Sequence, residues 1–407
     1  MAATASPSRF DSNEKKVLAF TGAAHALTHY VELAYPTLAV VFAVEIGLPL
    51  EEVLGWSLIG YMLLGFGALP AGYLADRYGS RMMVTSGLLL AGGAMFAAGF
   101  ASPGWPIVVC LALSGLGAST YHPAGMGLIS RSISARGTAL GINGIYGNFG
   151  IVLGPAVTGY LATTLGSQTT FIITGAGILV IALATGALRF EEPPPGAQQE
   201  PTNDGRVPIP RLLIASFVVL CIAALLAGFS YRANSVAQPA LFSERIQFLS
   251  FGFATSLAMC AGIGGQYLGG RIADRYSLTT SYLLFHAASL PAVLLIPYSS
   301  DYALLAAAAL FAFFALGMQP IENSLFAQLT PDRWRSTAYG LKFTLTFGFG
   351  ASAVAVVESV APSHGFVGVY HVLAFVIGGI IAACLTLVWI QRVGERSWSA
   401  PVVAGGE

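Results

Sequence analysis

The feature that most constrains this chain is a series of twelve apolar stretches, each near the roughly 20 residues that a helix needs to cross a bilayer. Backbone groups in lipid must be satisfied within the spanning segment, so these stretches are predicted to be helices. A stretch rich in Pro, Glu and Gln divides them into six and six. We therefore predict an all-α membrane protein with twelve transmembrane helices in two six-helix halves, residues 1–189 and 211–407, joined by a cytoplasmic linker at 190–210. The expected spans are 17–45, 53–75, 82–101, 105–130, 137–163, 168–189, 211–242, 249–271, 279–298, 302–329, 336–360 and 366–391.

The composition excludes most soluble classes of protein. Charged residues make up 9% of the chain, against about 25% in an ordinary soluble domain, and the mean hydropathy is +0.72. Basic and acidic residues are equal in number at 19 each, so no nucleic acid or other polyanionic partner is indicated. The sequence carries no phosphate-binding loop and no recognisable arrangement of catalytic residues, so we expect neither an enzyme nor a cofactor. The four cysteines lie in apolar runs and are predicted to be core residues rather than metal ligands.

The basic residues indicate the orientation of the spans. With twelve spans both termini lie on one side, and 16 of the 19 basic residues then fall in the loops and ends of that side. Because cytoplasmic loops carry an excess of Lys and Arg, we place both termini in the cytoplasm, in what we expect to be a bacterial inner membrane. The three exceptions are Arg232 and Lys342, inside spans, and Arg245, in an outer loop.

The two halves repeat one another. Gly72–Arg81 reads GYLADRYGSR, and Gly270–Tyr276 reads GRIADRY, at an offset of 198 residues. His122-Pro123 aligns with Gln319-Pro320. Two parallel repeats with a site between them are a known plan of membrane transporters.

The G-x-L-A-D-R-x-G-x-R loop resembles the cytoplasmic signature of the major facilitator superfamily, in which charged residues tie neighbouring helix ends together in one conformation. The resemblance implies gating roles for Asp76, Arg77, Arg81, Asp274 and Arg275.

The fifth span carries Gly150-Ile-Val-Leu-Gly154-Pro155, with Gly159 beyond it. This segment is similar to a motif of the antiporters in that family, which implies that Gly154 and Pro155 contribute to antiport geometry and favours export. A narrower resemblance, to the fosmidomycin-resistance branch, rests on residues 117–123 and 147–150.

Ionisable residues inside spans are costly and are therefore candidates for function. In the first half, His25, His29 and Glu32 are spaced i, i+4, i+7 on one face of a helix, and the family resemblance brings His122 of the fourth span toward the same aqueous space. The estimated depths of these three histidines and Glu32 in the bilayer spread over about 10 Å. Nearby candidates for the substrate site are Tyr121, Asn143 and Tyr146.

The second half supplies its own polar residues. Glu322 and Lys342 are at similar depth and are predicted to pair, and the pair either holds helices together or serves substrate and proton binding. Arg232 either contacts substrate or a gate, or extends its head group to the outer interface. Gln319 and Asn323 share the face of Glu322 and complete the candidate site.

Two functions follow as alternatives. The first is a monomeric, proton-coupled exporter (antiporter) of a small organic compound, in which Arg232 and Lys342 suggest an anionic substrate. The second is a transporter of a transition metal or metal chelate that uses the cluster His25, His29, Glu32 and His122. The cations Arg232 and Lys342 and the depth spread argue against the metal, and we predict no metal ligand. A membrane receptor or scaffold without transport is disfavoured by the repeated loops.

Overall fold

The computed structural model describes residues 10–192, 211–330 and 335–398, and over these ranges the secondary structure is helical. The linker predicted at 190–210 therefore lies outside the described residues from 193 onward. The helices before it are α1 (Ser12–Ile46), α2 (Leu50–Gly55), α3 (Leu58–Phe66), α4 (Ala68–Tyr78), α5 (Ser80–Ala98), α6 (Trp105–Ala118), α7 (Tyr121–Ser132), α8 (Arg136–Leu165) and α9 (Ser167–Gly186). Those after it are α10 (Arg211–Arg245), α11 (Phe251–Ala273), α12 (Leu278–Leu295), η1 (Ile296–Tyr298), α13 (Asp301–Gly317), α14 (Gln319–Gln328), α15 (Arg335–Phe343), η3 (Thr344–Phe349) and α16 (Ser352–Trp398).

These elements form the twelve predicted spans, several of them broken. By length and apolar character nine helical segments of the described chain could cross a membrane, or ten when the bent pair α2–α3 and α4 counts as one span. One of these segments, Ala338–Val393, holds two spans, because the backbone at Gly365 is non-helical, and this division brings the count to eleven. The 23-residue helix α11 is the twelfth.

The repeat seen in the sequence reappears as matched breaks. The fourth span divides between α6 and α7 just before Pro123, and the tenth divides between α13 and α14 just before Pro320. Proline lacks an N–H group and its ring clashes with the carbonyl four residues earlier, which interrupts the helix. Polar residues follow each break, and His122 and Glu322 among them are buried.

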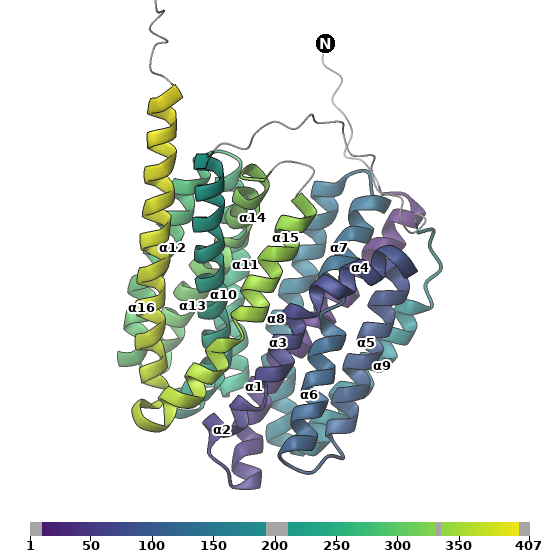
Figure 1. The fold of residues 1–407 in the computed structure, drawn as a ribbon. Coiled ribbons are helices and arrows are strands. Elements are labelled where there is room, and N and C mark those ends of the chain that lie inside the picture. Colours follow the sequence, from purple (N-terminus) through teal and green to yellow (C-terminus); the bar gives the residue numbers. More distant parts are fainter. Residues whose placement is uncertain (1–9, 193–210, 331–334, 399–407) are drawn as a thin grey trace, which may run out of the picture.

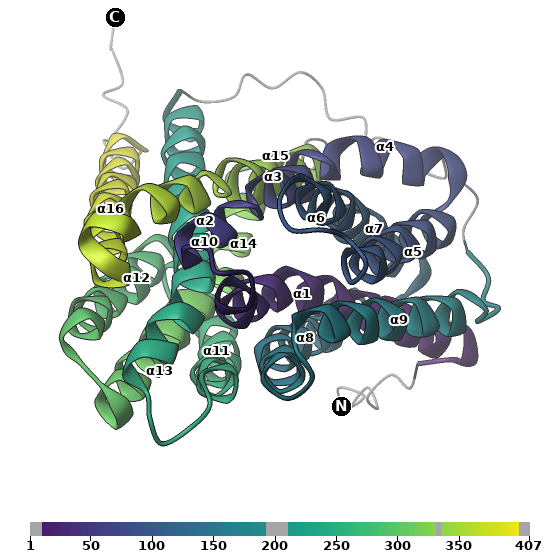
Figure 2. The ribbon, with the colours of Figure 1, turned by 90° about the horizontal axis from the view of Figure 1, so that it is seen from below.

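All twelve spans run between two ends of one bundle (Figure 1). We call the end where α1 begins and where α9 and α16 end the terminal end, at the top of Figure 1, and the opposite end the distal end. Seen from the distal end, α4 to α9 lie to one side and α10 to α14 with α16 to the other, while α1, α2, α3 and α15 lie near the boundary (Figure 2). The helices before residue 193 form the first group and those from 211 onward the second.

The two groups are packed together mainly in the distal half. A buried apolar cluster there combines Leu38 and Phe42 of α1 with Val236 and Leu241 of α10. A second cluster, nearer the terminal end, has buried members from the first group only, within the described residues. Helices α7 and α14, which lie toward the terminal end of the bundle, pack mainly on helices of their own groups. This conformation is therefore closed between the groups at the distal end.

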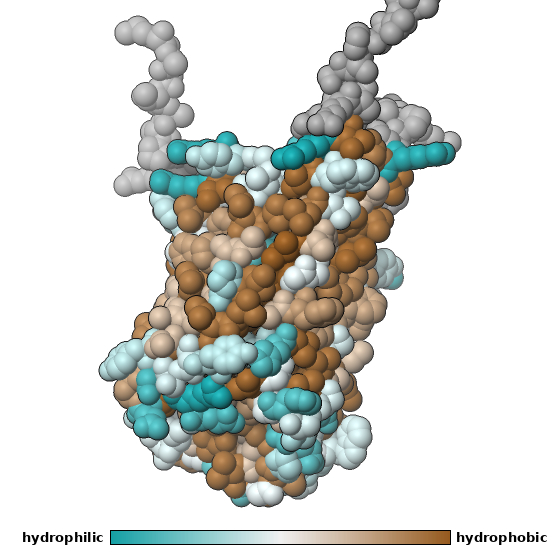
Figure 3. All heavy atoms as spheres, turned by 90° about the vertical axis from the view of Figure 1, so that its left-hand side faces the viewer, coloured by the Kyte–Doolittle hydropathy of each residue, from teal (hydrophilic) through white to brown (hydrophobic). Residues whose placement is uncertain are grey.

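The outer surface is suited to lipid. Most of the face formed by α16, α12 and α13 is hydrophobic, with polar side chains gathered at its upper edge and in part of its lower half (Figure 3). Phe375 and Trp389 of α16 and Leu284 of α12 are exposed on the isolated chain. Soluble proteins rarely expose an apolar surface of this extent. The low charge content of the sequence reflects this lipid-facing surface.

Candidate functional site

Three histidines from two helices of the first group meet in the interior; we call them the histidine cluster. His25 and His29 lie one turn apart on α1, and His122 faces them from the start of α7. The ring centroids of His25 and His29 are 4.9 Å apart, and each is 5.4 Å from that of His122. Phe343 of α15 and Phe347 of η3, in the second group, stack on the His122 ring at 5.1 and 5.4 Å. The cluster is thus covered by an aromatic contact between the groups.

Asn143 of α8 fixes the side of the cluster nearest the terminal end. Its backbone carbonyl lies 2.8 Å from Nδ1 of His25, and its side-chain Oδ1 accepts a hydrogen bond of 2.7 Å from Tyr121. Tyr121 in turn stacks on His25 with centroids 4.7 Å apart. The structure therefore brings together five residues that the sequence analysis placed near one aqueous space: His25, His29, His122, Tyr121 and Asn143.

An ion pair crosses between the groups just beyond the cluster; we call it the inter-group pair. Glu32 of α1 accepts a hydrogen bond of 2.5 Å from Nη2 of Arg232 on α10, and its other carboxylate oxygen is 2.7 Å from Nδ1 of His29. Both Glu32 and Arg232 are almost fully buried. The guanidinium carbon of Arg232 lies 3.6 Å from the centre of the Tyr61 ring, and the Tyr61 hydroxyl donates to the Glu32 carbonyl. The extension of Arg232 to an outer interface, one of the two expectations, is therefore wrong.

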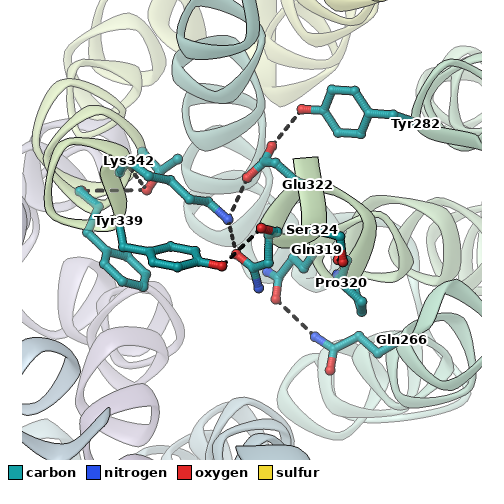
Figure 4. Close-up of polar contacts among 11 residues, drawn as sticks. Gln266, Tyr282, Gln319, Pro320, Glu322, Ser324, Tyr339 and Lys342 are labelled. Atoms are coloured by element: carbon teal, nitrogen blue, oxygen red, sulfur yellow. Dashed lines mark hydrogen bonds and ion pairs between the residues drawn. The ribbon is translucent and has the colours of Figure 1, made fainter. Parts of the chain in front are cut away.

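A second ion pair lies within the second group (Figure 4). Nζ of Lys342 on α15 is 2.7 Å from Oε1 of Glu322 on α14, which confirms the pairing predicted from their depths. Tyr282 of α12 donates to the other Glu322 oxygen at 2.6 Å, and Lys342 also donates to Oδ1 of Asn323 at 2.5 Å. The Tyr339 hydroxyl donates to the Asn323 carbonyl. Every charged atom of the pair therefore has a neighbour that limits its movement.

A chain of amides connects the groups beside this pair. Asn148 of α8 donates to Gln266 of α11 at 2.5 Å, and Gln266 donates to Gln319 of α14 at 3.0 Å. Figure 4 shows Gln266 and Gln319 facing each other across this hydrogen bond. Neutral amides can exchange these partners without leaving a buried charge, so this connection is suited to an interface that opens and closes.

Sequence reasoning missed four members of this arrangement: Tyr61 as the ring under Arg232, and Tyr282, Gln266 and Asn148 as hydrogen-bond partners. Gln266 was detectable as a polar residue in an apolar span, whereas no local signal marks which tyrosines face inward. Tyr146 was predicted to join the site, but its ring packs against Gly22 of α1 and is 42% exposed.

Comparison with known proteins identifies the family. A model described as the Major Facilitator Superfamily matches residues 18–355 and 220–404. The chain belongs to the major facilitator superfamily. It is therefore a transporter of the membrane, as the superfamily resemblance implied.

Characterised relatives of this superfamily member are distant. The multidrug efflux pump Tap of Mycobacterium tuberculosis is 24% identical over 344 residues, which cover 78% of this chain and 81% of that protein. The fosmidomycin resistance protein of Escherichia coli is 23% identical over 319 residues, covering 75% and 76%. A crystal structure of the peptide transporter POT in complex with sulfate has a TM-score of 0.73 and 16% identity, and covers 93% of this chain and 94% of that one.

The superfamily loop ties helix ends of the first group together at the terminal end. Arg131 of α7 is 3.5 Å from the Asp76 carboxylate of α4 and donates to the Ser80 hydroxyl at 2.7 Å. Arg81 donates to the Gly186 carbonyl at the end of α9. Arg77 lies over its neighbour Tyr78, and neither Asp274 nor Arg275 forms an ion pair with another described residue. Sequence reasoning missed Arg131 as the partner of Asp76.

The antiporter-like segment lies where α8 contacts both groups. A Cβ atom on Gly154 would be 3.1 Å from Leu33 of α1, and one on Gly252 of α11 would be 2.5 Å from the Pro155 carbonyl. Small residues here allow the close approach of α8 to α1 and α11.

We expect Arg131→Gln to slow transport with little effect on folding. The contacts of Arg131 to Asp76 and Ser80 are partly exposed, and exposed pairs of this kind contribute about 0–1 kcal/mol. The same pair nevertheless orients the ends of α4 and α7, which must move when the terminal end closes. The initial rate of uptake into vesicles and the thermal unfolding temperature should be compared with those of Arg392→Gln, at an exposed arginine near the end of α16. Equal rates in the two variants would contradict this role.

Proposed function

We propose that this transporter is a proton-driven antiporter that exports a small organic acid by alternating access, as a monomer with both termini in the cytoplasm of a bacterial inner membrane. The observation that carries the proposal is the buried Glu322–Lys342 pair, placed among the partly exposed Asn323, Gln319 and Tyr339. The names of the relatives, an efflux pump and a drug-resistance protein, support export.

The pair within the second group is suited to carry the proton. Both partners lie on one group, so their contact does not depend on how the two groups are arranged. The carboxylate can therefore lose or gain a proton in either conformation, as a coupled carrier requires. Tyr282 donates to Glu322 and Lys342 donates to Asn323, and a neutral hydroxyl and amide can keep such contacts when the carboxyl gains a proton.

The same pair explains how a substrate and a proton exclude each other. An organic acid that also carries a hydroxyl or amine can insert between the partners, its acid on Lys342 and its donor on Glu322. A proton on Glu322 removes the negative acceptor that such a donor needs, so the proton opposes substrate binding. Competition of this kind is the basis of antiport.

The inter-group pair provides the switch between conformations. Glu32 and Arg232 join α1 to α10 on the distal side of the histidine cluster, and each is buried against the other group. Opening of the distal end requires these charges to separate, which is unfavourable unless a ligand replaces one partner. The empty transporter is thereby held closed at the distal end.

Flux measurements in proteoliposomes test the proposal. Purified protein is reconstituted and loaded with radiolabelled fosmidomycin, and then with a panel of small hydroxy and amino acids, and a pH gradient is imposed in each direction. We expect efflux of a transported compound to rise when protons flow against it. Flux that is independent of the gradient, or that rises when protons flow with the compound, would overturn antiport.

We expect Glu322→Gln to uncouple the two fluxes. Glutamine keeps the size and the contact to Tyr282 but does not titrate. Coupling free energies of about 1–3 kcal/mol correspond to 5–150-fold, so gradient-driven efflux should fall by at least about fivefold while substrate exchange without a gradient persists. Glu52→Gln, at an exposed carboxylate of the distal end, is the matched control and should leave both fluxes unchanged.

A further inference from the structure

The histidine cluster has the features of a metal site. One ring nitrogen from each of His25, His29 and His122 lies within 4.8 Å of the others. Three imidazoles bound at about 2.1 Å in tetrahedral geometry have nitrogens about 3.4 Å apart, so modest side-chain rotations bring them into range. The 10 Å spread in depth estimated from the sequence does not hold for these three residues.

The hydrogen bonds of two rings occupy Nδ1 and leave Nε2 without a hydrogen-bond partner among the described residues. The partner of His25 Nδ1 is the Asn143 carbonyl, and that of His29 Nδ1 is the Glu32 carboxylate, 2.7 Å away. Both partners accept hydrogen bonds, so Nδ1 is the donor in each ring, and when the ring is neutral Nε2 holds the lone pair that can bind a metal. An acceptor behind the ring is the usual support of a metal-binding histidine, because it sets the tautomer and increases the basicity of the ligand.

The two cations near the cluster, Arg232 and Lys342, are each paired with a carboxylate, so they do not oppose the binding of a metal ion. Arg232 and Lys342 are each within ion-pair distance of a carboxylate, Glu32 and Glu322. Imidazole is a ligand type that suits borderline divalent ions such as Zn²⁺, Ni²⁺ and Co²⁺. Three protein ligands leave a fourth tetrahedral position for water or an acidic group.

We propose that His25, His29 and His122 bind one borderline divalent transition-metal ion, supported by Glu32 and the Asn143 carbonyl. The site links metal binding to the inter-group pair, because Glu32 contacts both His29 and Arg232. It does not depend on proton coupling.

Cobalt binding to the full-length protein in detergent, purified without a histidine tag, tests the proposal. We expect one Co²⁺ per chain, with the visible absorption of a tetrahedral complex that Zn²⁺ abolishes. His25→Gln, His29→Gln and His122→Gln should each lose this absorption. Glu32→Gln should weaken binding by about 10–100-fold, as loss of a supporting carboxylate does.

His286→Gln is the matched control, because His286 is a buried histidine of α12 in the other group. It should bind Co²⁺ like the wild type. Failure of the wild-type protein to bind Co²⁺ saturably, an octahedral spectrum, or equal loss in His286→Gln would overturn the site. None of these readouts involves a gradient, so failure of antiport leaves the metal site standing, and the reverse also holds.

Discussion

We expect Arg232→Met to unfold at a much lower temperature than the wild-type protein and to transport no substrate. The substitution leaves the Glu32 carboxylate buried with His29 but without its cation. Removing one partner of a buried ion pair costs about 3–5 kcal/mol, and the contact with the Tyr61 ring is lost as well. Thermal unfolding in detergent, followed by circular dichroism, measures the loss.

The double variant Glu32→Gln with Arg232→Met separates stability from function. Replacement of both buried charges by neutral groups of similar volume is often neutral or stabilising, so the unfolding temperature should return toward that of the wild type. Transport should remain absent, because the contact that switches between the groups is gone. Recovery of transport in the double variant would show that the pair serves folding alone.

We expect Gly65→Val to abolish transport while the protein still folds. Gly65 of α3 faces the backbone of Gly348 in η3, and a Cβ atom there would lie 1.9 Å from the Gly348 nitrogen. Since the atoms that the Cβ would meet belong to the backbone and cannot rotate away, the two groups must separate by about 1 Å or more at this contact. The variant should then be unable to adopt the conformation that is closed at the distal end.

Spin labels on Glu52 and Ser359, both exposed near the distal end of α2 and α16, measure this separation in a background without the native cysteines. The distance between the labels should increase in Gly65→Val. Gly177→Ala of α9 is the control, because nothing lies within 4 Å of its added Cβ, and it should change neither distance nor flux. An unchanged distance in Gly65→Val would show that the contact adapts locally.

Much of the fold was predictable because its causes are local. Stretches of apolar residues specify spans wherever they occur. The breaks before Pro123 and Pro320 were not predicted, because a proline need not end a helix: Pro36 and Pro155 lie inside unbroken ones. Glu322 and Lys342 could be paired from depth alone, since helices of known direction place residues at calculable heights.

Part of the candidate site was not predictable, because it depends on how helices are rotated about their axes. Depth does not distinguish Arg131 from Arg81 as the partner of Asp76, and it does not place Tyr61 under Arg232. The pairing of Glu32 with Arg232 joins residues 200 positions apart, on helices of different groups.

Only the tertiary structure decided which of the polar residues in the interior meet. Close contacts such as Gly65 with Gly348 and Gly159 with Gly252 set the approach and rotation of whole helices, and that packing converts scattered histidines and carboxylates into a cluster and two ion pairs.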